Sequence, residues 1–477
     1  MIQMTLAEVA AAVDGTLVGA DPAACVTGSV EFDSRKVGPG GLFTAFVGER
    51  ADGHDFAPAA LAAGAVAVLG SRPVPDAPTV LVADPLAALA ALARTVVDRL
   101  DRLTVIGLTG SSGKTTTKDM IAQLTARVGP TVAPEGSFNN ELGHPYTALR
   151  AGPDTRFLVL EKGARGPGHI AHLCRVVPPR IGLVLNVGVA HIGEFGSVEA
   201  IAAAKGELVE ALPPDGVAVL NLDDPRVAAM SRRTSATVVG YGLHGGPPHP
   251  AGGPAARAAD VTLDDRGRAS YTLVTPAGSQ RVRLAVAGGH QVGNSLAVAA
   301  VGLQLGLDLP EIAQALGELA PRSPRRMDVR DRPDGVTVID DSYNANPASV
   351  AVALQALAAM GQPRDRRPRR TVAVLGYLAE LGHHERDGHR EVGALAADLG
   401  VDLLVVVGAA AAGIHHGAVA RQTWGGEAVL VADQDEAVAV LAERLRSGDV
   451  VLVKGSRYRT WDVADWLRQP RPAEAAR

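Results

Sequence analysis

The sequence predicts an α/β protein of three domains, and three observations support this fold class. The chain has 477 residues, and at roughly 150 residues per domain this length predicts about three domains. Short runs rich in Val, Ile and Leu alternate with Ala- and Leu-rich helical stretches, which is typical of parallel sheets flanked by helices. Gly and Pro number 54 and 31, too few for a low-complexity chain, so we expect globular structure throughout.

Composition and charge exclude several classes of function. The 46 Lys and Arg residues against 51 Asp and Glu give a net charge of -5, so the chain lacks the basic field on which nucleic-acid binding depends. Cys25 and Cys174 lie far apart, which argues against a disulfide framework or a zinc site and fits a reducing compartment. The longest apolar run, residues 403–414, is shorter than the roughly 20 residues of a membrane span. We therefore expect a cytoplasmic protein with no membrane span and no nucleic-acid partner.

Two loops are candidate domain boundaries. A predicted helix that begins after Asp84 and Pro85 ends near residue 98, just before a β-branched strand, and a proline-containing loop lies near residues 321–324. The strands that the hydrophobic pattern predicts lie at residues 65–69, 79–82, 104–108, 157–160, 181–186, 217–220, 371–375 and 403–407. We therefore predict a substrate domain at 1–100, a central nucleotide-binding domain with a parallel sheet at 101–320, and a Rossmann-like domain at 321–477.

Two segments have the composition of loops. Residues 242–258 predict a long turn region, which alternating strands follow at 270–274 and 281–286. The basic, proline-containing stretch 361–370 predicts an exposed loop.

A glycine-rich turn follows the strand at 104–108 and leads directly into a helical pattern, as a phosphate loop requires. Gly110 and Gly113 let backbone amides converge on phosphate oxygens, Lys114 reaches the outer phosphates, and the Thr115 hydroxyl is suited to bind magnesium. The strict G-x-x-x-x-G-K-[ST] pattern would place a glycine where this chain has Leu108. The ATP contacts expected from this turn are Thr109, Gly110, Ser111, Ser112, Gly113, Lys114, Thr115 and Thr116.

The turn TGSSGKTTTK, with its displaced glycine, resembles the ATP loop of the Mur ligases, enzymes that build the peptide of the bacterial cell wall. Further motifs follow in the order of that family: SFNNELGHPYTAL (137–149), EKGARGPGHI (161–170), NVGVAHIGEFGSVEAIAAAKGEL (186–208), NLDDP (221–225), GHQVGNSLAVAA (289–300), SPRRMDV (323–329), DDSYNANP (340–347) and VLVKGSR (451–457). Residues 31–56 are similar to the uridine-nucleotide domain of some members. Within the family, GARGPGHI and YNANP point to the member that adds a dipeptide.

The resemblance implies an ATP-dependent ligase that joins D-alanyl-D-alanine to UDP-N-acetylmuramoyl-tripeptide in peptidoglycan synthesis, and we expect it to act as a monomer. An amide forms from a free carboxylate only after activation, which ATP supplies as an acyl phosphate. Both steps concentrate negative charge, so the site needs magnesium, with two ions expected, on hard oxygen or imidazole ligands. Thr115, Glu161 and His191 are of these types. Glu161 and His191 also follow predicted strands, at the sheet edge beside the phosphate loop.

Lys205 lies in a helical stretch, AIAAAKGEL, where an ordinary lysine is usually a surface residue. In Mur ligases the matching lysine is typically carbamoylated, so the resemblance implies that Lys205 becomes a carboxylate-like group that helps to position a second magnesium ion. The expected catalytic residues are Lys114, Glu161, His191 and Lys205, and the expected metal-binding residues are Thr115, Glu161, His191 and Lys205.

Three further residues resemble nucleotide contacts of the family. Asn294, in GHQVGNS, resembles an adenine-side or hinge-side residue, while Arg326 and Asp341 resemble groups of the third domain that reach the nucleotide. An arginine over phosphates and a carboxylate on ribose hydroxyls suit these roles, and domain closure would bring them in. A purely structural role in loops is the alternative for all three.

The remaining candidates concern the two other substrates. Ser34 and Arg35, together with the DGHDF segment at 52–56, are candidate contacts for the uridine diphosphate. Asn139 and Asn140 are candidates for the sugar or diphosphate nearer the reaction centre. The dipeptide is expected against Tyr343, Asn344 and Asn346, although YNANP is equally compatible with a structural turn.

Departures from the family pattern keep alternatives open. Lys162 stands where an apolar residue is usual, and it would weaken magnesium binding unless strand alternation turns it away from Glu161. Tyr377 replaces an expected aspartate, and Gly289 stands before His290 where a larger polar residue is common. The alternatives are a related ligase that adds another amino acid and an ATP-binding homologue with little catalytic activity.

Overall fold

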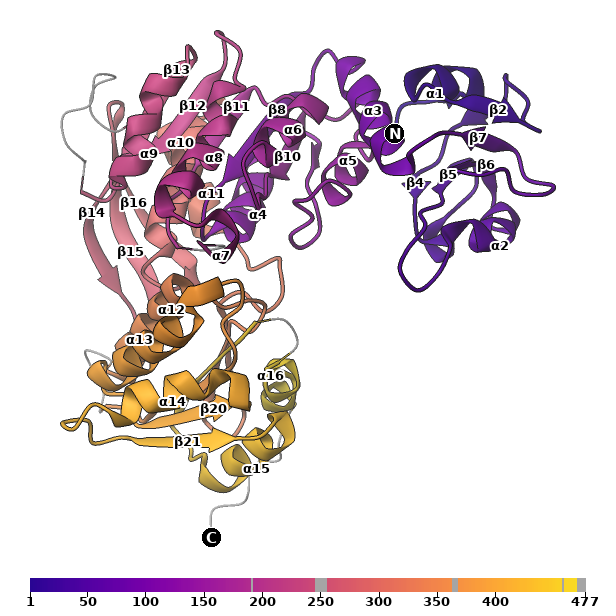
Figure 1. The fold of residues 1–477 in the computed structure, drawn as a ribbon. Coiled ribbons are helices and arrows are strands. Elements are labelled where there is room, and N and C mark those ends of the chain that lie inside the picture. The colour runs from indigo at the N-terminus through magenta and orange to yellow at the C-terminus, as the bar shows by residue number, and fades with distance from the viewer. Residues whose placement is uncertain (190–191, 245–254, 363–367, 457–458, 470–477) are drawn as a thin grey trace.

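The computed structural model describes residues 1–189, 192–244, 255–362, 368–456 and 459–469, and it forms three α/β domains (Figure 1). The predicted fold class is therefore confirmed. The first domain extends to one side of the central domain, and the third domain lies below the central domain in the view of Figure 1. His191, a predicted metal ligand, lies outside the described residues.

The first domain is built on a five-stranded sheet in the order β2-β7-β6-β5-β4. Its elements are β1 (Met4–Thr5), α1 (Leu6–Ala12), β2 (Thr16–Val18), β3 (Cys25–Val26), β4 (Val30–Glu31), η1 (Ser34–Lys36), β5 (Gly41–Thr44), η2 (Gly53–Phe56), α2 (Ala57–Ala62), β6 (Ala65–Gly70), β7 (Thr79–Leu81) and α3 (Pro85–Asp98). The helix predicted to follow Asp84 and Pro85 is present, but it begins at Pro85, which occupies the first turn, and Asp84 caps it.

The first and central domains share apolar packing. Leu89 and Leu92 of α3 belong to the same buried cluster as Leu158 and Leu160 of the central sheet. This packing fixes the first domain against the side of the central domain, with α3 at the junction (Figure 1).

The central domain carries a nine-stranded sheet in the order β16-β15-β14-β13-β12-β11-β8-β10-β9. Its strands are β8 (Thr104–Thr109), β9 (Thr131–Val132), β10 (Phe157–Glu161), β11 (Ile181–Val184), β12 (Val217–Asn221), β13 (Thr237–Gly242), β14 (Ala256–Leu263), β15 (Arg268–Thr275) and β16 (Gly278–Ala287). The sheet is parallel from β9 to β14, as predicted, and it continues through β15 and β16 as an antiparallel extension.

Helices cover the central sheet. They are α4 (Lys114–Thr125), α5 (Gly143–Ala148), α6 (His169–Val176), α7 (Ile192–Phe195), α8 (Val198–Glu210), α9 (Pro225–Ala229), η3 (Met230–Arg233), α10 (Gln291–Gln304) and α11 (Leu309–Gly317). Of the long turn predicted at 242–258, residues 245–254 lie outside the described residues, and β14 already begins at Ala256.

The third domain has a six-stranded sheet in the order β17-β18-β22-β19-β20-β21, parallel except for the β17–β18 pair, which makes it Rossmann-like as predicted. Its elements are β17 (Asp328–Asp331), β18 (Thr337–Asp340), α12 (Pro347–Gly361), β19 (Thr371–Leu375), η4 (Gly382–His384), α13 (Glu385–Asp398), β20 (Leu403–Val407), η5 (Ala409–Ala411), α14 (Ala412–Val419), β21 (Glu427–Val431), α15 (Gln434–Arg444), β22 (Val450–Lys454) and α16 (Trp461–Arg468). Residues 363–367 of the predicted basic loop lie outside the described residues.

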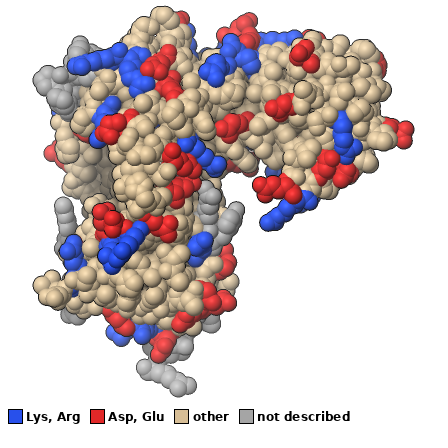
Figure 2. Space-filling view, viewed as in Figure 1, with Lys and Arg blue, Asp and Glu red and all other residues tan. Residues whose placement is uncertain are grey.

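Charge is mixed over the visible surface. Figure 2 shows Lys and Arg interspersed with Asp and Glu, with no face of a single sign in this view. None of the described helices is long and apolar enough to cross a membrane.

Two glycines let α13 and α14 cross at close range. A Cβ atom on Gly393 of α13 would collide with the carbonyl oxygen of Ile414, and one on Gly417 of α14 would collide with that of Arg390. Both obstacles are backbone atoms, so a side-chain rotation cannot relieve either collision.

We predict that Gly393→Ala lowers the free energy of unfolding of the third domain by about 1–3 kcal/mol or more, because the two helices must move apart. Urea unfolding followed by tryptophan fluorescence measures this, since all three tryptophans, Trp424, Trp461 and Trp466, lie in the third domain. Gly425→Ala, where an added Cβ meets nothing within 4 Å, is the matched control. Equal stability of the two variants would contradict the packing argument.

Candidate active site

The glycine-rich turn joins the end of β8 to the start of α4. Gly113 occupies the N-cap of α4 with φ 79°, a left-handed conformation that glycine adopts without strain. The Lys114 Nζ donates to the Gly110 carbonyl at 2.7 Å, and the Ser112 backbone N–H donates to Asn186 Oδ1 at 2.9 Å. The turn is thus held in the shape of a phosphate loop at the amino end of a twelve-residue helix.

Glu161 is the last residue of β10 and lies beside Leu108 of β8 in the parallel register. Its side chain is fully buried, and Asn139 Nδ2 donates to its Oε2 at 3.3 Å. No described residue donates a hydrogen bond to the buried Oε1. A buried carboxylate oxygen without a partner is costly, so this oxygen fits a bound cation.

Lys162 points away from Glu161, as strand alternation predicts. Its Nζ lies 2.9 Å from His144 Nε2 and also donates to the carbonyls of Leu173 at 3.3 Å and Val177 at 3.1 Å. Burial lowers the pKa of the Lys162 amine. This side chain therefore ties α5 and α6 to β10 behind the site.

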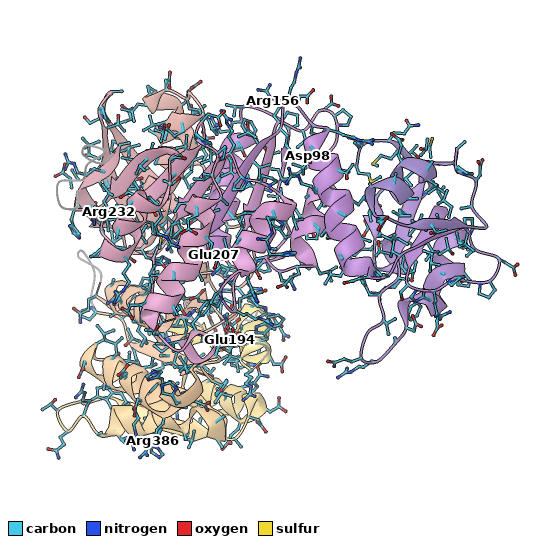
Figure 3. The ribbon with its side chains drawn as sticks, turned by 45° about the horizontal axis from the view of Figure 1, so that its top comes forward. Asp98, Arg156, Glu194, Glu207, Arg232 and Arg386 are labelled. Atoms are coloured by element: carbon cyan, nitrogen blue, oxygen red, sulfur yellow. The ribbon has the colours of Figure 1, made fainter. Side chains whose placement is uncertain are left out.

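Lys205 lies on α8 with its side chain buried, not on the surface as an ordinary helix lysine would. Burial, followed by the charge of Lys114, holds the pKa of the Lys205 amine well below its usual value. Two residues further along the helix, Glu207 accepts hydrogen bonds from the backbone N–H groups of Gly168 and Ala171, at 2.6 and 2.9 Å (Figure 3). These bonds hold the amino end of α6 against the helix that carries Lys205.

The third domain presents Arg326 on a strained loop. Arg325 and Met327, on either side of it, have φ values of 59° and 51°, which side chains rarely adopt. Arg325 is held by two hydrogen bonds to Asp465, at 2.7 and 2.8 Å, and the Met327 backbone N–H donates to Asp341 Oδ1 at 3.2 Å. These contacts hold the strained backbone in place.

Arg326 itself reaches the phosphate loop. Its guanidinium donates to the Thr115 hydroxyl at 3.4 Å, while its Nε is buried without a partner in the described part of the chain. A buried guanidinium N–H without an acceptor, placed beside a phosphate loop, is suited to bind an anionic ligand. Burial, opposed by the charge of Glu161 and reinforced by that of Arg326, lowers the pKa of Lys114.

Asp341 forms an ion pair that the predicted residue set did not include. Lys454, at the end of β22, donates to Asp341 Oδ2 at 2.5 Å and to the Asn344 carbonyl at 3.0 Å. The motif VLVKGSR, in which a lysine ends a strand, was the available signal for Lys454.

Burial lowers the pKa of the neighbouring His290 to about 4, which keeps that imidazole neutral at pH 7.

A cleft of about 920 Å³ brings most of the predicted residues together. The predicted residues that line it are Thr109, Ser111, Ser112, Gly113, Lys114, Thr115, Thr116, Asn139, Asn140, Glu161, Lys205, Asn294, Arg326, Asp341, Tyr343, Asn344 and Asn346. Ser34 and Arg35 lie apart on η1 of the first domain, where Arg35 is exposed and pairs with Asp33 at 2.8 Å. Besides Lys454, the lining includes Ser137, Asn186, Asn221, Tyr241 and Trp461, which were not predicted as site residues.

Several predicted substrate contacts also hold local backbone. Asn346 caps α12 by accepting from the Ser349 N–H at 2.9 Å, and Asn344 Oδ1 accepts from Ser456 Oγ at 3.1 Å. Asn140 Oδ1 accepts from the Gly143 N–H at 2.9 Å. The bonds of Asn344 and Asn346 show that SYNANP has a structural role, which the sequence left open as an alternative. In DGHDF, the buried His54 likewise bonds to Asp52.

The central and third domains touch beside the cleft. The Gly193 N–H in α7 donates to the Glu380 carbonyl at 3.3 Å, and Figure 3 shows Glu194 at the junction of the two domains. Asn294, at the amino end of α10, faces Gly113 and donates to Gln291 Oε1 at 2.8 Å. Asn294 thus supports the phosphate loop from within the central domain, while the third domain contacts the central domain through the Gly193–Glu380 and Arg326–Thr115 hydrogen bonds.

A phosphate loop at the carboxyl edge of a parallel sheet, faced by an arginine of another domain, indicates an enzyme that binds a nucleotide between two domains. Family models match the chain throughout: the Mur ligase family catalytic domain at residues 28–97, the Mur ligase middle domain at 108–302, and the Mur ligase glutamate ligase domain at 325–457. The chain belongs to the Mur ligase family.

Individual relatives agree with this assignment. The chain is 48% identical to a UDP-N-acetylmuramoyl-tripeptide--D-alanyl-D-alanine ligase of Mycobacterium leprae, over 96% of each sequence. It is similar to the crystal structure of MurF from Acinetobacter baumannii, with a TM-score of 0.86 and 31% identity over 98% of this chain and 99% of that one. It is also similar to MurF from Thermotoga maritima in complex with ADP, with a TM-score of 0.77 and 31% identity over 92% and 97% of the two chains.

We predict that Glu161→Gln abolishes the rise in melting temperature that magnesium and ATP produce in the wild type. The unliganded variant should melt at or above the wild-type temperature, because a neutral amide costs less to bury than an unpaired carboxylate. A ligand at 100 times its Kd stabilises a protein by about 2.7 kcal/mol, so thermal melting with and without ligands measures the effect. Glu207→Gln is the control that should keep the ligand-induced rise. A full rise in Glu161→Gln would contradict a cation at Glu161.

Proposed function

We propose that this chain is an ATP-dependent ligase that joins D-alanyl-D-alanine to UDP-N-acetylmuramoyl-tripeptide, giving the UDP-linked pentapeptide of peptidoglycan synthesis. The similarity over nearly the full length to ligases of this name supports the choice of substrates. The main structural support for the proposed reaction is that Lys114, Glu161 and Arg326 line one cleft between two domains. We place this reaction in the cytoplasm, where ATP is available, and expect a monomer.

The reaction runs in two steps. A carboxylate oxygen of the tripeptide attacks the γ-phosphorus of ATP, which forms an acyl phosphate and releases ADP. The dipeptide amine then attacks the acyl carbon, the amide bond forms, the amine loses a proton, and inorganic phosphate leaves. Lys114, the amides of the phosphate loop and Arg326 stabilise the charge on the transferred phosphoryl group, and the closed domains exclude water from the acyl phosphate.

Magnesium fits this site. Thr115 and Glu161 are the described residues that would hold an ion, and the unpaired Glu161 oxygen supports this role. His191 remains a proposed ligand outside the described residues. Bound magnesium would neutralise charge on the phosphates during transfer.

Carbamoylation of Lys205 is the second part of the metal proposal. Only the unprotonated amine attacks carbon dioxide, and burial beside Lys114 lowers the pKa of Lys205 and so favours that form. The new N–C bond leaves a carbamate after a proton is lost. This anion would offset the charge of Lys114 and help to hold a second magnesium ion.

The substrates are assigned to the two ends of the cleft. We propose that Ser34 and Arg35 contact the uridine diphosphate in a first domain of residues 1–100, and that Asn139 and Asn140 contact the substrate nearer the reaction centre. In the central domain, proposed as residues 101–320, Asn294 would contact the adenine side of ATP. In a third domain of 321–477, Asp341 would bond the ribose. The dipeptide would lie against Tyr343, Asn344 and Asn346, which line the same cleft as the phosphate loop.

We predict that phosphate release from ATP requires both UDP-N-acetylmuramoyl-tripeptide and D-alanyl-D-alanine, because the acyl phosphate turns over only when an amine arrives. A coupled phosphate assay measures this with each substrate omitted in turn. Single amino acids with shorter UDP-linked peptides form the comparison that separates related ligases. ATP binding without amide formation would overturn the proposed function.

We predict that enzyme kept in ¹³C-labelled bicarbonate shows a carbamate carbon signal in its NMR spectrum, and that Lys205→Met loses both this signal and most activity. Losing a group that positions a metal typically costs about 10–100-fold in activity or metal affinity. An active enzyme with an unmodified Lys205 would contradict the carbamate.

A further inference from the structure

Contacts between the central and third domains converge on Tyr343, which follows β18. Its hydroxyl hydrogen bonds with the Ser137 hydroxyl of the central domain at 2.6 Å. The guanidinium of Arg326 lies over its ring, 4.1 Å from the centroid. The same guanidinium reaches the Thr115 hydroxyl at 3.4 Å. A continuous chain of contacts thus runs from Ser137 through Tyr343 and Arg326 to the phosphate loop.

The central-domain end of this chain lies next to the proposed cation site. Ser137 begins the segment 137–140, in which Asn139 donates to Glu161 Oε2 at 3.3 Å. The Asn139 carbonyl accepts from the N–H of Gly163, two residues beyond the end of β10, at 3.0 Å. The position of Ser137 is therefore tied to the residues that carry Glu161.

We propose that Tyr343 is a positioning residue: its hydrogen bond to Ser137 fixes the ring on which Arg326 rests, and so sets Arg326 over the phosphate loop when the third domain meets segment 137–140. This inference rests on the proposed ligase function and adds to it a structural link between domain closure and phosphoryl transfer. The Tyr343 hydroxyl and one ring face are taken by Ser137 and Arg326, so the dipeptide would have only the remaining ring surface.

The physical reason is the freedom of the arginine side chain. A long side chain loses rotamer entropy when it is ordered on a ligand, and an aromatic face that already holds the guanidinium removes part of that cost before the reaction. The strained backbone at Arg325 and Met327 fixes the base of Arg326 in the same way, while Tyr343 fixes its tip. Without the Ser137 bond, the ring and the guanidinium would lose their common orientation.

The test is a double-mutant cycle with Ser137→Ala, Tyr343→Phe and both together, measured by phosphate release at saturating ATP, UDP-N-acetylmuramoyl-tripeptide and D-alanyl-D-alanine. Each single variant should lower kcat by about three- to tenfold, the range expected for loss of one hydrogen bond. The KM for ATP should stay within about twofold of the wild type, because the bond acts on the transition state. The double variant should be no slower than the slower single variant.

Tyr377→Phe is the matched control. Tyr377 is also in the third domain, its hydroxyl donates to Glu385 Oε2 at 3.0 Å, and Arg459 lies over its ring at 4.8 Å. It does not line the cleft, so this variant should keep the wild-type kcat.

Two results would overturn the proposal: single variants with a kcat within about twofold of the wild type, or a double variant whose loss equals the product of the two single losses. A double loss smaller than that product supports the coupling. Failure of the ligase function itself is recognised separately, because the wild-type enzyme would then show no phosphate release that depends on the dipeptide.

Discussion

The parallel register of β8 with β10 is the constraint on which the cleft depends. It brings the end of β10 beside the turn that leaves β8, so that Glu161 and the phosphate loop occupy one edge of the sheet. The same alternation that directs Glu161 into the cleft directs Lys162 behind it, where the lysine ties two helices to the strand. A single strand thus supplies both a group for the site and an anchor for its support.

The third domain completes the site with Arg326, which lies opposite the phosphate loop between two residues in strained backbone conformations. Left-handed conformations at Arg325 and Met327 cost energy, which the bonds to Asp465 and Asp341 help to offset. The result is an arginine fixed at its base and held at its tip by an aromatic ring. An arrangement of this kind is suited to catalysis because charge is already oriented when the phosphoryl group moves.

The sequence was most informative where function depends on local pattern. Strand periodicity and the glycine turn predicted the phosphate loop and the place of Glu161, because both follow from residues adjacent in the chain. The hydrogen bond between Ser137 and Tyr343, which joins two domains across 206 residues of sequence, gave no such signal. Within the third domain, the motif VLVKGSR pointed to Lys454, but nothing in the sequence indicated that it pairs with Asp341, 113 residues away. Asn346 is a local case, because the sequence already allowed a structural turn at YNANP and the structure shows Asn346 as the cap of α12. Its contact with a dipeptide remains a proposal.

The central claim is that the carboxylate is activated as an acyl phosphate in this cleft. Its most direct test uses UDP-N-acetylmuramoyl-tripeptide labelled with ¹⁸O in the carboxylate that reacts. During turnover with ATP and D-alanyl-D-alanine, the account predicts that one labelled oxygen appears in the released inorganic phosphate, because the attacking oxygen leaves with the phosphoryl group. Released phosphate without ¹⁸O would contradict the account.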